Sequence, residues 1–149
     1  GLIRHPEGGY FREVYRSPRE VTAVEDGRRR SALTTIYYLL PEGDCSRWHQ
    51  LRSDELWHHL EGDPLELFLV DPKQFTLQCI LLGPAAEGET GVQDVPAGHW
   101  QAARSTGAYT LVGCTMGPGF DLADHRFLED DPEAAARFRQ ELPDLAGMI

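Results

Sequence analysis

The sequence predicts an all-β domain, a sandwich or a barrel, with a single helix near its end. Nine or ten short runs of alternating or β-branched residues are separated by Gly, Pro and Asp turn signals at regular spacing. Helix signals occur only over 131–142, where Asp131 suits the N-cap, Pro132 suits the first helical position and Pro143 ends the helix. Many short strands with one terminal helix are typical of two packed β-sheets.

The strands are expected in chain order from these runs. The run 10–16 alternates aromatic or apolar residues with charged ones, and the run 33–40 is β-branched and aromatic, as in a central strand. Between them, Asp26-Gly27 is a hairpin-type turn signal. A strand that carries His49 comes next. The remaining extended ranges are 55–62, 65–70, 75–82, 92–95, 99–104, 109–116 and 120–128.

Length, charge and cysteine content restrict the class of protein. The 149 residues suffice for one domain with a single core, spanning 1–149. Fourteen Lys and Arg against 24 Asp and Glu give a formal charge of −10, which argues against a general attraction to nucleic acid or anionic lipid. The apolar runs are too short to span a bilayer, and no signal peptide is visible. Because Cys45, Cys79 and Cys114 show no metal-knuckle or redox spacing, we expect reduced thiols in a cytoplasmic protein.

The stretch 43–62 carries the residues on which a functional hypothesis depends. Side chains two apart on a strand share a face, so His49 is expected to point away from its neighbour Trp48. His49 and Glu55 are six residues apart at neighbouring strands, and the fold would have to bring this imidazole and carboxylate into one cavity. On the second strand, one face is expected to carry Glu55, Trp57 and His59, and the other Leu56, His58 and Leu60.

Two segments carry the spacing of the cupin motifs. The first motif is Gly, five residues, His-x-His, three or four residues, Glu, six residues, Gly, and the second ends in Pro-x-Gly-x-x-His. The sequence therefore resembles the cupin superfamily, which implies that the all-β domain is a double-stranded β-helix (jelly roll), here with one C-terminal helix. The matching residues are Gly43, His49, Glu55, Gly62, Pro96 and Gly98, whereas Leu51 and Gln101 stand where the motifs have histidines.

The chain resembles one cupin family more narrowly. This is the single-domain family often called cupin type 5. The resemblance implies a family without an assigned reaction. It also implies that the protein is commonly a homodimer whose N-terminal strands pack across subunits. A weaker similarity to deoxysugar-nucleotide 3,5-epimerases places His49 on the epimerase base. The segments similar to cupin type 5 are 5–13, 48–49, 54–58, 96–101 and 118–120, and those similar to the epimerases are 9–13, 48–50 and 61–71.

The resemblance also implies where a metal would bind. Cupins use two histidines and the Glu of the first motif and the histidine of the second, but two of these four positions are Leu51 and Gln101 here. With two of the four motif ligands replaced, we expect no resident metal and no other cofactor. If a divalent metal is bound, the expected ligands are His49, Glu55 and Gln101, with His58 or His59 as substitutes.

An acid–base site fits the remaining residues better. His49 titrates near neutrality, and Glu55 can orient its ring or act as its partner, which suits removal of a proton next to a carbonyl. We therefore expect His49 and Glu55 to be the catalytic residues of an isomerase, epimerase or lyase acting on a small sugar-like metabolite. The expected substrate-binding residues are Tyr10, Arg12, Tyr38, Trp57, His58, His59, Trp100 and Gln101.

Other interpretations stay open at the level of residues and of function. His49 can equally be a core histidine bonded to Gln101 or to a backbone carbonyl. Trp57 and Trp100 can be core residues, and Arg12 can lie exposed on an edge strand. The chain can also be a non-catalytic binding module or a metal-dependent cupin enzyme, and in each case its partner is a small molecule.

Overall fold

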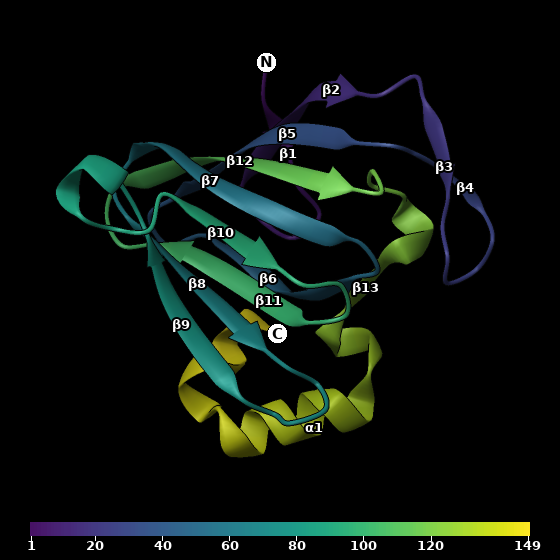
Figure 1. Cartoon of the computed structure of the whole chain (residues 1–149). Coiled ribbons are helices and arrows are strands. Elements are labelled where there is room, and N and C mark those ends of the chain that lie inside the picture. The colour runs from purple at the N-terminus through teal and green to yellow at the C-terminus, as the bar shows by residue number, and fades with distance from the viewer.

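Two antiparallel β-sheets face each other in the computed structural model, which describes residues 1–149 (Figure 1). One sheet has six strands in the order β1 (Ile3–Arg4), β2 (Tyr10–Arg16), β5 (Thr34–Pro41), β12 (Tyr109–Gly117), β7 (Asp54–Gly62) and β10 (Val92–Val95). The other has five, in the order β13 (His125–Phe127), β6 (Cys45–Leu51), β11 (Trp100–Ser105), β8 (Leu65–Val70) and β9 (Leu77–Leu82). The expected all-β jelly roll with one C-terminal helix is confirmed.

The remaining elements are short and lie outside the two sheets. A hairpin of β3 (Glu20–Thr22) and β4 (Arg29–Ser31) surrounds the predicted Asp26-Gly27 turn. The one α-helix is α1 (Pro132–Glu141). None of the helices is long and apolar enough to cross a membrane. The 3₁₀ helices are η1 (Ala85–Glu87), η2 (Leu122–Asp124), η3 (Leu128–Asp130) and η4 (Pro143–Met148).

The predicted extended stretch 120–128 is wrong in part. Only His125–Phe127 forms a strand, and a 3₁₀ helix precedes it. The Asp121 side chain accepts a hydrogen bond from the Ala123 backbone N–H (2.9 Å), which stabilises this local turn in place of a strand ladder. The turn brings His125 to the edge of β6.

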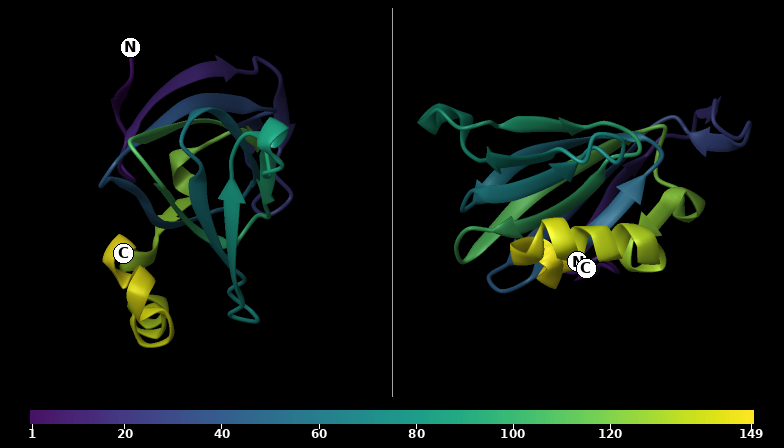
Figure 2. Two further views of the ribbon diagram at one scale, coloured as in Figure 1. Left: turned by 90° about the vertical axis from the view of Figure 1, so that its left-hand side faces the viewer. Right: turned by 90° about the horizontal axis from the view of Figure 1, so that it is seen from below.

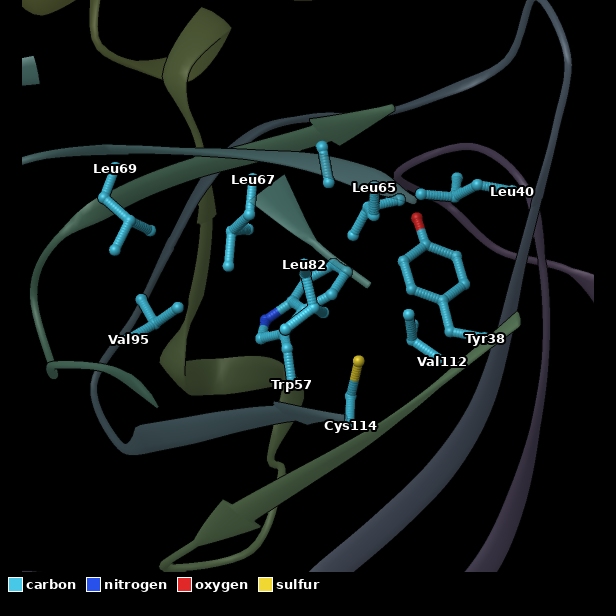
Figure 3. Close-up of a cluster of buried hydrophobic side chains, with 11 residues drawn as sticks. Tyr38, Leu40, Trp57, Leu65, Leu67, Leu69, Leu82, Val95, Val112 and Cys114 are labelled. Carbon is cyan, nitrogen blue, oxygen red and sulfur yellow. The ribbon is translucent and has the colours of Figure 1, made fainter. Parts of the chain in front are cut away.

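The core between the sheets follows the period of two along each strand. Leu65, Leu67 and Leu69 of β8 point inward and are buried, whereas the intervening residues face the other side. Figure 3 shows these aliphatic side chains around the rings of Tyr38 and Trp57, which come from the opposite sheet. Burying each large apolar side chain contributes about 1.5–3 kcal/mol, so this layer is a main source of stability.

A second apolar layer attaches α1 to the outer face of the five-stranded sheet. Seen from below in Figure 2, the helix lies across this sheet, and Phe138 packs between the rings of Trp48, Phe75 and Trp100. The Trp48 indole N–H donates to the Leu145 carbonyl oxygen (3.1 Å). The helix begins as predicted, because Asp131 caps it by accepting from the Ala134 backbone N–H (3.1 Å) and Pro132 follows.

A buried ion pair ties the β3–β4 hairpin to the segment before β13. Arg30 donates two hydrogen bonds to the Asp124 carboxylate, at 2.7 and 2.9 Å. These hydrogen bonds hold the pKa of Asp124 below its usual range. The pair fixes the residue next to His125 and so helps to position β13 beside the cavity described below.

Candidate functional site

A cavity of about 160 Å³ lies between the two sheets. Ten of its 17 lining residues are hydrophobic, so its walls are mainly apolar. The lining contains no Lys or Arg, and its ionisable groups are three glutamates, two histidines, one tyrosine and one cysteine. The cavity therefore suits a small ligand that is partly apolar and not anionic.

Glu55 places a buried carboxyl group in the cavity wall. It is the second residue of β7, where the period of two turns it inward, and only 6% of it is exposed. The Gln101 amide N–H donates to its Oε2 (2.7 Å), and the Trp57 indole N–H donates to the Gln101 Oε1 (3.1 Å). Because the indole can only donate, it fixes the amide orientation, and the amide in turn fixes the carboxyl group.

Burial raises the pKa of Glu55 to about 7, and the negative charge of Glu7 adds to the shift. The carboxyl group is thus close to half-protonated at neutral pH. A group in this state can both donate and accept a proton, as a general acid or base requires.

Glu7, His49 and His125 form a second polar cluster, which comes from three separate segments. His125 Nε2 lies 2.9 Å and His49 Nε2 3.4 Å from the same oxygen, Oε1 of Glu7. The Ser46 hydroxyl donates to the other oxygen, Oε2 (2.9 Å). The two imidazole rings are stacked, with centroids 5.4 Å apart and planes 12° apart. Glu7 and His125 line the cavity, whereas His49 lies behind them and is 1% exposed.

The Glu7 carboxylate of this cluster stays ionised at neutral pH. Burial opposes ionisation of Glu7, but the attraction of His49 and the hydrogen bond to His125 outweigh it and hold the pKa of Glu7 at about 2. Burial lowers the pKa of His49, so its ring is neutral at pH 7. The cavity thus contains two glutamates with opposite behaviour, Glu7 charged and Glu55 able to exchange a proton.

The structure separates the two residues that the sequence suggests as a catalytic pair. His49 lies in β6 of the five-stranded sheet and Glu55 in β7 of the six-stranded sheet, because the bend at 52–54 crosses between the sheets. His49 lies beside Glu7, and the hydrogen-bond partner of Glu55 is Gln101. His49 and Gln101 are both buried behind the lining and do not themselves reach the cavity.

Tyr38 and Trp57, which the sequence suggests for ligand binding, line the cavity, and the Tyr38 hydroxyl donates to the Gly8 carbonyl oxygen (3.0 Å). The other five residues suggested for ligand binding lie elsewhere: Tyr10, Arg12, His58, His59 and Trp100.

Strand alternation explains four of these five placements, and position along β7 explains that of His59. Tyr10 and Arg12 are exposed on the outer face of β2, opposite to Phe11, which lines the cavity. Trp100 faces α1. His58 points away from the face of Trp57, and His59 lies at the far end of β7, where its Nε2 is 3.3 Å from the Asp63 carbonyl oxygen.

The positions that bind metal in other cupins do not form a ligand set here. Leu51 has no donor atom, and both ends of the Gln101 amide are occupied by Trp57 and Glu55. Of the metal ligands expected from the sequence, Glu55 and Gln101 bond to each other, whereas His49 lies beside Glu7. The donor atoms that do come together are those of Glu7, His49 and His125, which all lie within 4.8 Å of one another.

Glu7 and His125 are the two site residues that sequence reasoning missed. A signal for Glu7 existed, because Gly8 and Gly9 follow it with φ of +118° and +62°, and a Cβ on Gly8 would overlap the Cys45 carbonyl oxygen. Only glycine lets this turn press against β6. No comparable spacing marks His125, since its position depends on the register of β13 with β6.

The two facing jelly-roll sheets and the cavity between them define a cupin. The chain belongs to the Cupin_5 family, described as Cupin superfamily (DUF985), whose model matches residues 1–128. It is 31% identical over 147 residues to "Uncharacterized protein YML079W" of Saccharomyces cerevisiae, which covers 89% of this chain and 73% of the yeast protein.

Solved structures agree with this assignment. A hypothetical protein from Leishmania major is 34% identical with a TM-score of 0.81, over 99% of this chain and 90% of that one. Protein SO0799 from Shewanella oneidensis is 30% identical with a TM-score of 0.79, over 97% of this chain and 90% of that one. A variant of oxalate decarboxylase from Bacillus subtilis is 19% identical with a TM-score of 0.64, over 100% of this chain but 38% of that one, and shows the fold alone.

Proposed function

We propose that this cupin catalyses a proton transfer, in an isomerisation, epimerisation or lyase reaction, on a small neutral sugar-like carbonyl compound. The observation that carries the proposal is the buried Glu55 carboxyl group in the cavity wall. Gln101 holds one of its oxygens, which leaves the other for a ligand. Its pKa of about 7 suits exchange of a proton at neutral pH, and such general acid–base help contributes roughly 10²–10⁴-fold in rate.

The cavity lining supports this substrate class. Its charged groups are glutamates and histidines, and the absence of Lys and Arg argues against a nucleotide diphosphate, for which cationic side chains are the usual partners. The similarity to deoxysugar-nucleotide epimerases stays a prediction, and the lining argues against the nucleotide part of such a substrate. The volume of about 160 Å³ is below the roughly 300–1,000 Å³ of pockets for drug-sized ligands.

Glu55 and the Glu7–His125 pair suggest separate roles. Glu55 would remove or deliver the proton on carbon. The ring of His125 would lie beside the carbonyl or hydroxyl oxygen, where negative charge develops as the carbon–hydrogen bond breaks, and the Glu7 carboxylate would hold that ring in place. Phe11, Phe120 and Met116 are among the apolar lining residues that would exclude water from this reaction.

Hydrogen exchange tests the proposal without knowledge of the natural substrate. The protein is incubated in D₂O near neutral pD with neutral ketoses and aldoses of three to six carbons, and loss of the proton next to the carbonyl is followed by NMR. We expect exchange in at least one probe, a Glu55→Gln variant at least 100-fold slower, and an unchanged rate in Glu42→Gln, which changes an exposed glutamate outside the cavity. Exchange that survives in Glu55→Gln, or no exchange of any probe by the wild type, would refute the proposed reaction.

A second candidate function is small-molecule binding without turnover, which the mainly apolar lining favours. In that case a sugar-like probe raises the melting temperature in a concentration-dependent way while its protons do not exchange. The same probe set therefore separates the two functions.

The expected homodimer and cytoplasmic location stay predictions. Apolar side chains exposed on the N-terminal strands, such as Ile3 (63%) and Tyr15 (50%), support pairing of two chains through this region. Light scattering coupled to size-exclusion chromatography measures the molar mass, and a Tyr15→Lys variant is expected to favour the monomer.

A further inference from the structure

We propose that Glu7, His49 and His125 bind a divalent transition-metal ion such as Zn²⁺ at the edge of the cavity. This donor set shares only His49 with the ligand positions of the cupin motifs, and it takes its other two members from the N-terminal turn and from β13. The inference goes beyond the proposed proton transfer and does not depend on it.

The donor atoms already have separations that suit a metal. Ligands of a tetrahedral zinc ion with bonds of about 2.1 Å lie roughly 3.4 Å apart. The Nε2 atoms of His125 and His49 are 2.9 and 3.4 Å from Oε1 of Glu7, and all donor atoms lie within 4.8 Å of one another. Small shifts of side chains would thus suffice to surround an ion, which would displace to solvent the proton that His125 Nε2 donates to Glu7.

The tautomer of His49 gives an independent reason for a cation. Its Nδ1 lies 2.7 Å from the Arg47 carbonyl oxygen, which can only accept, so Nδ1 carries the proton. Nε2 is therefore the ring atom that faces the Glu7 carboxylate, 3.4 Å from Oε1, and the two atoms can share a cation that lies between them. A metal ion provides that cation, and a proton on Nε2 is the alternative that the experiment below excludes or establishes.

The surroundings of the cluster are those of a supported metal site. Metal-binding histidines usually donate their second ring N–H to a carbonyl or carboxylate, as His49 does to Arg47. Metal-binding carboxylates are themselves hydrogen-bonded, as Glu7 is by the fully buried Ser46 hydroxyl. Glu7 is 5% and His49 1% exposed, so neither side chain needs further burial to take up the ion.

The ligand types restrict the metal. Two imidazoles and one carboxylate suit Zn²⁺, Fe²⁺, Mn²⁺ or Co²⁺ rather than Ca²⁺ or Mg²⁺, which prefer oxygen ligands. Three protein ligands leave a coordination position open, as in catalytic rather than structural zinc sites. Because Glu7 and His125 line the cavity, a ligand bound there could reach this position.

Metal binding is measured on tag-free protein that has been stripped with EDTA and dialysed into a non-chelating buffer at pH 7.5. Calorimetric titration with ZnSO₄ is expected to give one ion per chain, and titration with CoCl₂ to give visible absorption bands of bound Co²⁺. Glu7→Gln and His125→Ala are each expected to weaken Zn²⁺ binding by at least 100-fold. Ser46→Ala removes only the hydrogen bond to Glu7 and is expected to weaken it by about 10–100-fold.

Two control variants make the result specific. His58→Ala changes a histidine outside the cluster, and Glu55→Gln changes the proposed proton-transfer group, so both should bind Zn²⁺ like the wild type. Circular dichroism of the metal-free variants shows which of them fold, and the mild Ser46→Ala keeps the test valid if His125→Ala does not. Absence of saturable binding, or equal affinity in wild type, Glu7→Gln and Ser46→Ala, would overturn the metal site and leave the proposed function of Glu55 untouched.

Discussion

Replacing Glu55 with Gln should stabilise the protein at alkaline pH and hardly change its stability at acid pH. The substitution keeps the size of the side chain, and the Gln101 amide can still donate to the new amide oxygen. It removes only the ionisation of the buried carboxyl group. Comparing the two proteins therefore measures the free energy of unfolding that the wild type loses because this carboxyl group is buried in the cavity wall.

The sign and size follow from the pKa of Glu55, which rises from an ordinary 4.5 to about 7 on folding. The folded state retains the proton in a pH range where the unfolded chain has lost it, so stability is fully present below pH 4.5 and is lost as the pH rises through 7. Integrated over this range, the loss is about 0.2 kcal/mol at pH 4 and about 3 kcal/mol at pH 8. The Gln variant avoids this loss, and its melting temperature at pH 8 should exceed that of the wild type by roughly 6–12 °C.

The assay is thermal or urea unfolding of both proteins between pH 4 and pH 8 in the presence of EDTA. A Glu42→Gln variant serves as the control for loss of one exposed carboxylate. If the difference between wild type and Glu55→Gln is the same at pH 4 and pH 8, the carboxyl group does not titrate near neutrality. The acid–base role would then lose its main support.

Three further substitutions test the elements that hold the site. Phe138→Ala, in the aromatic layer under α1, should cost about 3–5 kcal/mol in urea unfolding, and a cost below 1 kcal/mol would show that this layer does not anchor the helix. Asp131→Ala removes the cap of α1 and should cost about 1 kcal/mol, whereas Asp131→Asn should cost less. Gly8→Ala would place a Cβ against the Cys45 carbonyl oxygen at a φ of +118°, so it should displace Glu7 and weaken Zn²⁺ binding as well as stability, and unchanged binding would contradict this role of the turn.

The period of two predicted which residues of each strand face inward, because this property depends only on local backbone geometry. Glu55 and Trp57 point into the interior and Trp48 points out toward α1, as alternation requires. The ranges 10–16, 65–70 and 92–95 match β2, β8 and β10 residue for residue. Turn residues bound each of these strands, so even their ends were encoded locally.

The partners of the inward-facing polar groups could not be predicted in this way. His49 and Glu55 are close in sequence, but the bend between them takes the chain from one sheet to the other. Their partners are then chosen by packing across the core, which brings Gln101 from β11 to Glu55 and Glu7 from the N-terminal turn to His49. Both contacts join residues more than 40 positions apart in the chain, and no local pattern encodes such a separation.

Leu51 and Gln101 replace the two motif histidines, and together they change which groups of the site carry a charge. Gln101 cannot bind a metal and hydrogen-bond Glu55 and Trp57 at once. Burial raises the pKa of Glu55 to about 7, although the hydrogen bond from Gln101 lowers it. Leu51 gives His49 no co-ligand on the same strand, and His49 lies beside Glu7, whose carboxylate stays ionised between His49 and His125. One cavity thereby contains a carboxyl group that can exchange a proton and, beside it, a charged cluster suited to a cation. A reaction that moves a proton on carbon needs the first, and stabilisation of the adjacent oxygen is what the second, with its metal ion, would add.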